Sequence, residues 1–306
     1  MNELRARLSD YAALRRSLGF AAKELDYYLP SFVRYMESKE AGHISTGAAL
    51  AWATLPAGLL PVSYSQRLGA VRGFARYLAN LDPMTEVPPA DLLPARYSRV
   101  APYLYSDDDV SALMAAARNL APELRGATYE TFIGLLAVSG LRSGEAIRLD
   151  RADIRRHQLV VRNSKHEAAR EVPLHQTALR ALRSYAALRD GLAPNSGTSA
   201  FFVSTLGRRL TQVTVDAAFR KILAAAGIQA APGRRRPRLH DLRHSFAVKS
   251  VAEWRLAGID VDARMPALAK VLGHANPAST YWYLQASPEL FGSVAGRLDA
   301  AWGDQQ

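Results

Sequence analysis

The sequence predicts a mainly α-helical protein with a small antiparallel β-sheet, divided into two domains. Three observations support this fold class. Apolar residues recur at helical spacing over most of the 306-residue chain, which is long enough for two cores. Five of the 16 prolines gather between residues 83 and 102 and separate two helical stretches. Strand-like runs occur together in a single region, at residues 158–174.

Four short helices are predicted before the prolines, and they would form a small helical domain over residues 1–83. The first begins near the N-terminus. The second, over residues 22–38, contains Pro30, which should kink or split it because proline has no backbone donor. The third follows Ser45, a residue type that caps helix N-termini, and the fourth covers about residues 63–80.

Residues 84–104 are expected to form an extended linker, because proline resists helix formation. The second domain would then cover residues 105–306. Its first helix is predicted after Ser106, which stands three residues before Asp109 in the pattern of a capping box.

Within the second domain, a buried helix over residues 128–139 should end at Gly140, because glycine suits the left-handed position after a helix. Residues 158–162 and 170–174 are expected to pair as a hairpin whose turn covers residues 163–169. Further helices are predicted at residues 175–190, 211–226, 240–256 and 262–272, followed by a tail helix with the apolar stripe Leu290, Phe291, Val294 and Leu298.

Composition excludes several classes of site. The chain has no cysteine, so disulfides and thiolate metal sites are excluded. There is no signal-peptide core, and the longest nearly apolar stretch, about residues 48–62, is too short to cross a bilayer. We therefore expect a soluble, cytoplasmic protein without a membrane partner. No phosphate-binding glycine loop is present, and no metal or organic cofactor is expected.

The net charge of +11 favours a polyanion such as duplex DNA as partner. A generally basic protein without such a partner would show the same charge, so charge alone does not decide. One basic run leads directly into His240, and its predicted role is contact with the DNA backbone, against the alternative of a solvated surface. Its members are Arg234, Arg235, Arg236 and Arg238.

Six residues of the second domain combine two guanidiniums, an ammonium, two imidazoles and a phenol. This combination suits one task, which is to hold a phosphodiester while a tyrosine oxygen attacks its phosphorus. The six are Arg142, Lys165, His240, Arg243, His274 and Tyr283.

The local context of these residues agrees with that task without proving it. Arg142 stands at a turn between two predicted helices, where Glu145 could hold its guanidinium toward a phosphate, although a plain surface ion pair is the alternative. His240 and Arg243 are three residues apart and share one helix face. Lys165 lies in the predicted hairpin turn, from which it could reach a DNA groove or only face solvent.

The phrases around these residues resemble the tyrosine recombinases, also called the phage integrase family. The phrases are Ser139-Gly-Leu-Arg-Ser-Gly-Glu145, Leu239-His-Asp-Leu-Arg-His244, Leu272-Gly-His-Ala275 and Thr280-Tyr-Trp-Tyr283. The resemblance implies a helical SAM-like core-binding domain and a C-terminal catalytic domain that clamp DNA between them. It also favours Tyr283 over its competitor Tyr281 as the nucleophile. The last phrase is similar to those of integrases carried by transposons and other mobile elements.

The resemblance implies a site-specific recombinase or integrase that cuts and rejoins DNA through a 3′-phosphotyrosine link, without metal or ATP. Arg142 and Arg243 would stabilise the charge on the phosphate. His240 would accept the tyrosine proton, and His274 would donate a hydrogen bond to the phosphate. Lys165 would be the general acid, although the glycines that commonly flank this lysine in the family are absent here.

The implied partners are double-stranded DNA with a specific recombination site and three further copies of the chain in a tetramer, with accessory proteins as an open option. Two rival functions also stay open. A type IB topoisomerase shares this chemistry but needs no second duplex. A non-catalytic DNA-binding accessory protein would have no need of Tyr283.

Overall fold

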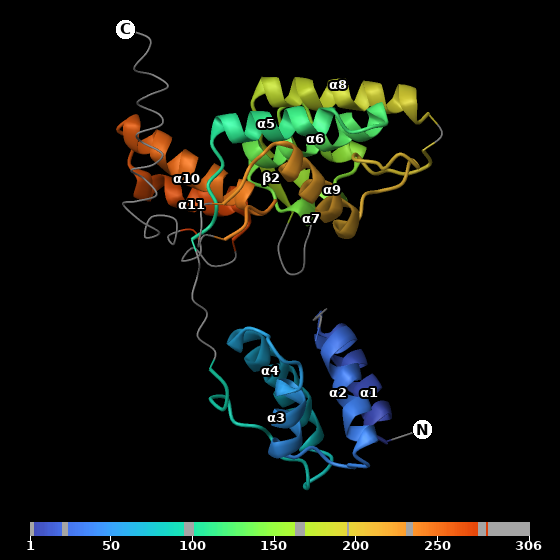
Figure 1. Cartoon of the computed structure of the whole chain (residues 1–306). Helices are drawn as coiled ribbons and strands as arrows, with labels where there is room; N and C mark the ends of the chain where they lie inside the picture. The colour runs from blue at the N-terminus through green and yellow to red at the C-terminus, as the bar shows by residue number, and fades with distance from the viewer. Residues whose placement is uncertain are drawn as a thin grey trace. The chain divides into compact units, whose positions relative to one another are not determined.

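The structure is a computed structural model that describes residues 3–19, 24–94, 101–162, 169–194, 196–230, 235–274 and 280. The chain divides into two units, Met1–Arg99 and Val100–Gln306, and each is described by itself (Figure 1). The division falls within the segment expected to form the linker.

The first unit is a helical bundle around a core that contains Phe32 and Phe74. Ser45 caps α3 by accepting a hydrogen bond from the Ala48 amide at 3.1 Å, as its residue type predicts. Pro30 lies in the first turn of α2, where a missing backbone donor costs little, and a π-helical turn precedes it. The elements are α1 (Glu3–Ser17), the π-turn η1 (Glu24–Tyr28), α2 (Leu29–Ser38), α3 (Thr46–Thr54) and α4 (Pro61–Leu78).

The segment after α4 folds back onto the same unit. Arg72 donates from Nε and Nη2 to the carbonyls of Pro88 and Pro89, each at 2.8 Å. The Glu86 amide donates to the Ile44 carbonyl at 2.7 Å. Prolines lack a backbone donor but still accept hydrogen bonds, so this part of the proline-rich segment is bonded to the helical unit.

The second unit is built around α6 (Glu123–Ser139), which contacts α5, α7, α8 and α10. Figure 1 shows α8 along one side of α6, with α10 and α11 together at one end of the unit. Ser106 and Asp109 form the predicted capping box at the start of α5. The other elements are α5 (Asp107–Arg118), α7 (Ser143–Arg148), the 3-10 turn η2 (Arg151–Asp153), β1 (Gln158–Val161), β2 (Arg170–Pro173), α8 (Gln176–Leu192), α9 (Gln212–Ala225), α10 (Asp241–Leu256) and α11 (Val261–Leu272).

The two strands form the predicted antiparallel hairpin. Gln158 lies opposite Pro173, and Val161 lies opposite Arg170. The turn that joins the strands and the predicted tail helix lie outside the described residues, apart from the last residue of the turn. The mainly α fold class with one small antiparallel sheet is confirmed. Among the described residues, no helix has the length and apolarity needed to cross a membrane.

The chain enters the second unit along α10. The Tyr105 amide donates to the Ser245 hydroxyl at 2.8 Å, and the Tyr105 hydroxyl donates to the Arg238 carbonyl at 3.1 Å. The Tyr103 ring packs edge-on against Tyr105, with 4.9 Å between ring centres. These contacts fasten the entering chain to the helix that carries His240 at its N-cap.

Candidate active site

Arg142 is held at the sharp turn between α6 and α7. Helix α6 ends at Gly140, whose φ of 63° is left-handed, as predicted. A Cβ atom at Gly140 would lie 2.5 Å from a ring carbon of Phe246, so no larger residue fits without displacing its neighbours. The turn places Arg142 at the N-cap of α7 with 37% of its side chain exposed.

A buried carboxylate orients Arg142. Oε1 of Glu145 accepts from Nη1 of Arg142 at 2.9 Å, and Oε2 accepts from the Arg142 amide at 2.9 Å and from Nη2 of Arg170 at 2.8 Å. Burial raises the pKa of Glu145, but the hydrogen bonds and charges of Arg170 and Arg142 outweigh it, so the pKa lies below its usual value. Glu145 is therefore a fixed anion between two guanidiniums.

Arg243 lies on α10 and is only 2% exposed. Its Nη1 donates to the Gly140 carbonyl at 2.8 Å, and its Nη2 donates to the Leu272 carbonyl at 2.5 Å. Nη2 of Arg142 donates to the Gly273 carbonyl at 2.8 Å. Both guanidiniums thus bind carbonyls at the C-terminal ends of α6 and α11, where the helix dipole favours cations.

Two histidines lie within the field of these arginines. Partial desolvation, followed by the charges of Arg243 and Arg238, lowers the pKa of His240. Burial, followed by the charges of Arg243 and Arg142, lowers the pKa of His274 to about 4. The structure therefore brings four of the six predicted residues together in one cluster.

Two further residues complete the histidine environment and were not expected from the sequence. The His244 ring lies perpendicular to the His240 ring, with 5.0 Å between centres. Thr280 is fully buried, and its hydroxyl oxygen lies 2.6 Å from Nδ1 of His274. Both stand inside the sequence phrases quoted above, so their position in those phrases was the available signal.

Arg170 is a third residue that the sequence reasoning missed. It opens β2, it is 9% exposed, and Val172, two residues on, is buried on the same strand face. An arginine on the apolar face of a predicted strand is unusual, because burying a guanidinium requires partners. That pattern was the signal that could have revealed it.

The remaining predicted residues divide into two groups. Arg238 forms an ion pair with the fully buried carboxylate of Asp241 at 2.8 Å, so its charge is partly used within the protein. Arg236 is exposed. Three predicted residues lie outside the described residues, namely Lys165, Tyr283 and Arg234.

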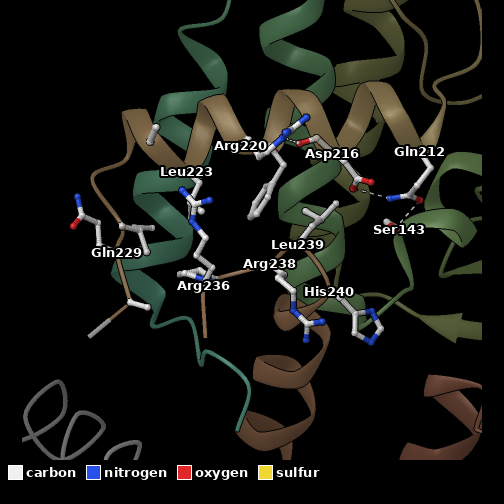
Figure 2. Close-up of a pocket in the computed structure, with 15 residues that line it drawn as sticks. Ser143, Gln212, Asp216, Arg220, Leu223, Gln229, Arg236, Arg238, Leu239 and His240 are labelled. Atoms are coloured by element: carbon white, nitrogen blue, oxygen red, sulfur yellow. Dashed lines mark hydrogen bonds between the residues drawn. The ribbon is translucent and has the colours of Figure 1, made fainter. Parts of the chain in front are cut away.

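A cavity of about 900 Å³ opens beside His240. Figure 2 shows His240, Arg236 and Arg238 along it, with Leu223 of α9 among its apolar lining. Three arginines and one carboxylate, Asp216, line it, so its net positive charge favours an anionic occupant. Within the described part of the chain, no three His, Asp or Glu side chains come together as a metal site would require.

The chain matches the model of the Phage integrase family over residues 104–289. It is 39% identical to the protein y4rB of Sinorhizobium fredii, whose name marks it as a candidate integrase/recombinase. That alignment covers the whole of both chains.

Solved structures share the fold. The integrase of transposon Tn1549 in complex with circular intermediate DNA has a TM-score of 0.65 and 18% identity, covering 95% of this chain and 99% of that one. Lambda integrase in a tetramer bound to a Holliday junction has a TM-score of 0.62 and 21% identity, covering 90% and 78%. At these identities the likeness concerns the fold alone.

Proposed function

The chain belongs to the phage integrase family of tyrosine recombinases, and from this premise we propose that it cuts and rejoins DNA through a 3′-phosphotyrosine intermediate. It is a site-specific recombinase. The observation that carries the proposal is that two guanidiniums meet at the C-terminal ends of α6 and α11, with His274 directly after α11 and His240, at the N-cap of α10, within their field. Such a set can bind a phosphodiester and the charge that develops on it.

Arg142 and Arg243 bind the non-bridging oxygens of the scissile phosphate. Glu145 and three backbone carbonyls already hold the two guanidiniums in place, so little reorganisation is needed when DNA binds. The exposed part of the Arg142 side chain is the part that a phosphate can reach.

The nucleophile is the phenol oxygen of Tyr283, whose ordinary pKa is about 10. His240 accepts its proton, because the lowered pKa leaves this imidazole neutral at pH 7 and able to act as a base. The oxygen of Tyr283 then bonds to phosphorus while the bond to the 5′ oxygen breaks. Lys165 gives a proton to that leaving oxygen, so a free 5′-hydroxyl forms.

The reaction needs no ATP, because the phosphotyrosine link retains the energy of the broken bond. It needs no metal, because Arg142 and Arg243 take the charge of the phosphate. The 5′-hydroxyl of another strand attacks that link and releases the tyrosine. The tetramer of lambda integrase on a Holliday junction and the transposon integrase on its DNA support two extensions to this chain. The first is that this chain assembles as a tetramer on a specific duplex site. The second is that it acts in the transfer of a mobile element.

The test is a nicked duplex made from an inverted repeat, to be sought in the DNA beside the gene. The unaltered protein should form a denaturant-resistant protein–DNA adduct. Tyr283→Phe should form none while still binding DNA, because only the nucleophilic oxygen is lost. Tyr281→Phe is the matched control and should retain the adduct.

Each failure has its own meaning in this test. An adduct from Tyr283→Phe would remove Tyr283 from the role of nucleophile. The absence of any adduct from the unaltered protein, on DNA that it binds, would contradict the phosphotyrosine intermediate.

A further inference from the structure

Arg170 joins three parts of the second unit. Its Nη2 donates to Oε2 of Glu145 at 2.8 Å, and its Nε donates to the Val271 carbonyl at 2.9 Å. The first contact reaches the start of α7, and the second reaches the last turn of α11, just before Gly273 and His274. One guanidinium on β2 therefore contacts two of the segments that carry phosphate-binding groups, those of Arg142 and His274.

We propose that Arg170 is a positioning residue that fixes Glu145 and the end of α11, and thereby aims Arg142 at the scissile phosphate. This inference rests on the proposed function. Arg170 acts through Glu145, whose Oε2 receives hydrogen bonds from both Arg170 and the Arg142 amide.

The burial of Glu145 makes this contact necessary. The Glu145 side chain is 1% exposed, and an isolated carboxylate at such a position would lose its charge. Without Arg170, Oε2 of Glu145 would accept only the hydrogen bond from the Arg142 amide. With Arg170 present, both oxygens have a cationic partner, and the carboxylate stays charged and held at both ends.

Gly273 supplies an independent observation. A Cβ atom there would lie 2.6 Å from Nη1 and 2.7 Å from Cζ of Arg170, and the φ of Gly273 is +64°. The guanidinium thus lies directly against the backbone of the residue whose carbonyl accepts from Arg142. Lysine cannot reproduce this arrangement, because a single ammonium lacks the planar fork that reaches two acceptors.

The first experiment measures single-turnover adduct formation on the nicked duplex. Arg170→Met keeps the aliphatic stem and should slow adduct formation by roughly 10- to 100-fold, because the phosphate-binding groups lose their alignment. Arg170→Lys should recover only part of the rate. Arg155→Met is the matched control, since Arg155, just before β1, pairs with exposed Glu171 of β2 at 3.8 Å, and it should leave the rate unchanged.

Two readouts separate positioning from a general loss of fold. The rate deficit of Arg170→Met should be larger at about pH 6 than at about pH 8, because Glu145, left with only Arg142 beside it, takes up a proton more readily. In a Glu145→Gln background, Arg170→Met should slow the reaction far less than it does alone. Circular dichroism and DNA affinity should match the unaltered protein. A deficit that is equal at both pH values and additive with Glu145→Gln would overturn the proposal.

A second experiment does not require the protein to cleave DNA. In nitrogen-15 arginine spectra of the full chain, the Arg142 guanidinium should rotate slowly, and faster in Arg170→Met but not in Arg155→Met. Unchanged rotation of Arg142 in Arg170→Met would also overturn the proposal. If the unaltered protein forms no adduct, the proposed function fails. The rotation of the Arg142 guanidinium still shows whether Arg170 positions Arg142.

Discussion

At the scale of single residues, Thr280 contacts His274 at the ring nitrogen that decides its tautomer. The His274 pKa of about 4 keeps its ring neutral at pH 7, and a neutral imidazole carries one N–H. When the Thr280 hydroxyl donates to Nδ1, across the 2.6 Å that separate them, the ring proton resides on Nε2. Nε2 is then the atom that can donate to a phosphate oxygen. A Thr280 hydroxyl that donates to Nδ1 would select the tautomer that the proposed reaction requires.

The lowered pKa values of His274 and His244 predict how the stability of the second unit depends on pH. Burial lowers the folded-state pKa of His274 to about 4 and that of His244 to about 3, below the ordinary value of about 6.5. The unfolded chain therefore binds more protons as the pH falls below about 6.5, so the stability of the second unit should fall between about pH 7 and pH 5. The midpoint of its thermal transition in the intact chain measures this.

His244→Gln is the control for that prediction. It removes one of the titrating groups, so the midpoint of the variant should depend less on pH over the same interval. Carboxylates with lowered pKa values, such as Glu145, lose their charge only at more acid pH and do not mask the effect. A midpoint that is equal at about pH 7 and pH 5 would show that these imidazoles are not buried in their neutral form.

At the scale of elements, what could be predicted depends on the distance over which the determining contacts act. Helix starts at Ser45 and Ser106 and the helix end at Gly140 were predictable, because capping uses neighbours three or four residues away. The position of Arg170 was not, because its partners stand 25 and 101 residues away in the sequence. The π-helical turn before α2 was not predicted either, since the expectation was a helix that is kinked or split at Pro30.

The end of α6 yields a prediction of its own. In Gly140→Ala, the new Cβ would meet Phe246 at 2.5 Å and Leu272 at 2.8 Å, and the backbone would keep a left-handed φ. We expect a loss of at least about 1–3 kcal/mol in the free energy of unfolding of the second unit. Urea unfolding of the intact chain measures it. Gly191→Ala in α8, where no atom lies within 4 Å of the new Cβ, should be neutral or slightly stabilising.

At the scale of the whole molecule, the chain carries a net charge of +11 and has a core in each of its two units. Its basic side chains can contact the phosphates of DNA. Binding that depends on lysine and arginine contacts with phosphates releases counterions, so it weakens as salt rises. The logarithm of the affinity should therefore fall linearly with the logarithm of the salt concentration, by about 0.9 per phosphate contacted. Fluorescence anisotropy of a labelled duplex measures this slope.

Single arginines should change the slope in different ways. Arg236→Gln should reduce its magnitude by about one, because an exposed cation beside the site is lost. Arg118→Gln is the control, since Glu130 already neutralises Arg118, and the slope should stay the same. A slope near zero for the unaltered protein would contradict DNA binding through the phosphate backbone.

The contacts of Tyr105 couple the entering chain to α10. Tyr105 of the entering chain forms hydrogen bonds with the Ser245 hydroxyl, which lies on α10, and with the Arg238 carbonyl, which lies just before α10. A shift of residues 103–105 would therefore be passed directly to the helix that bears His240 and Arg243. Besides Tyr105, Leu104 packs against the core formed by α10 and α11, and Asp107 pairs with Lys249 of α10, so several contacts share this attachment.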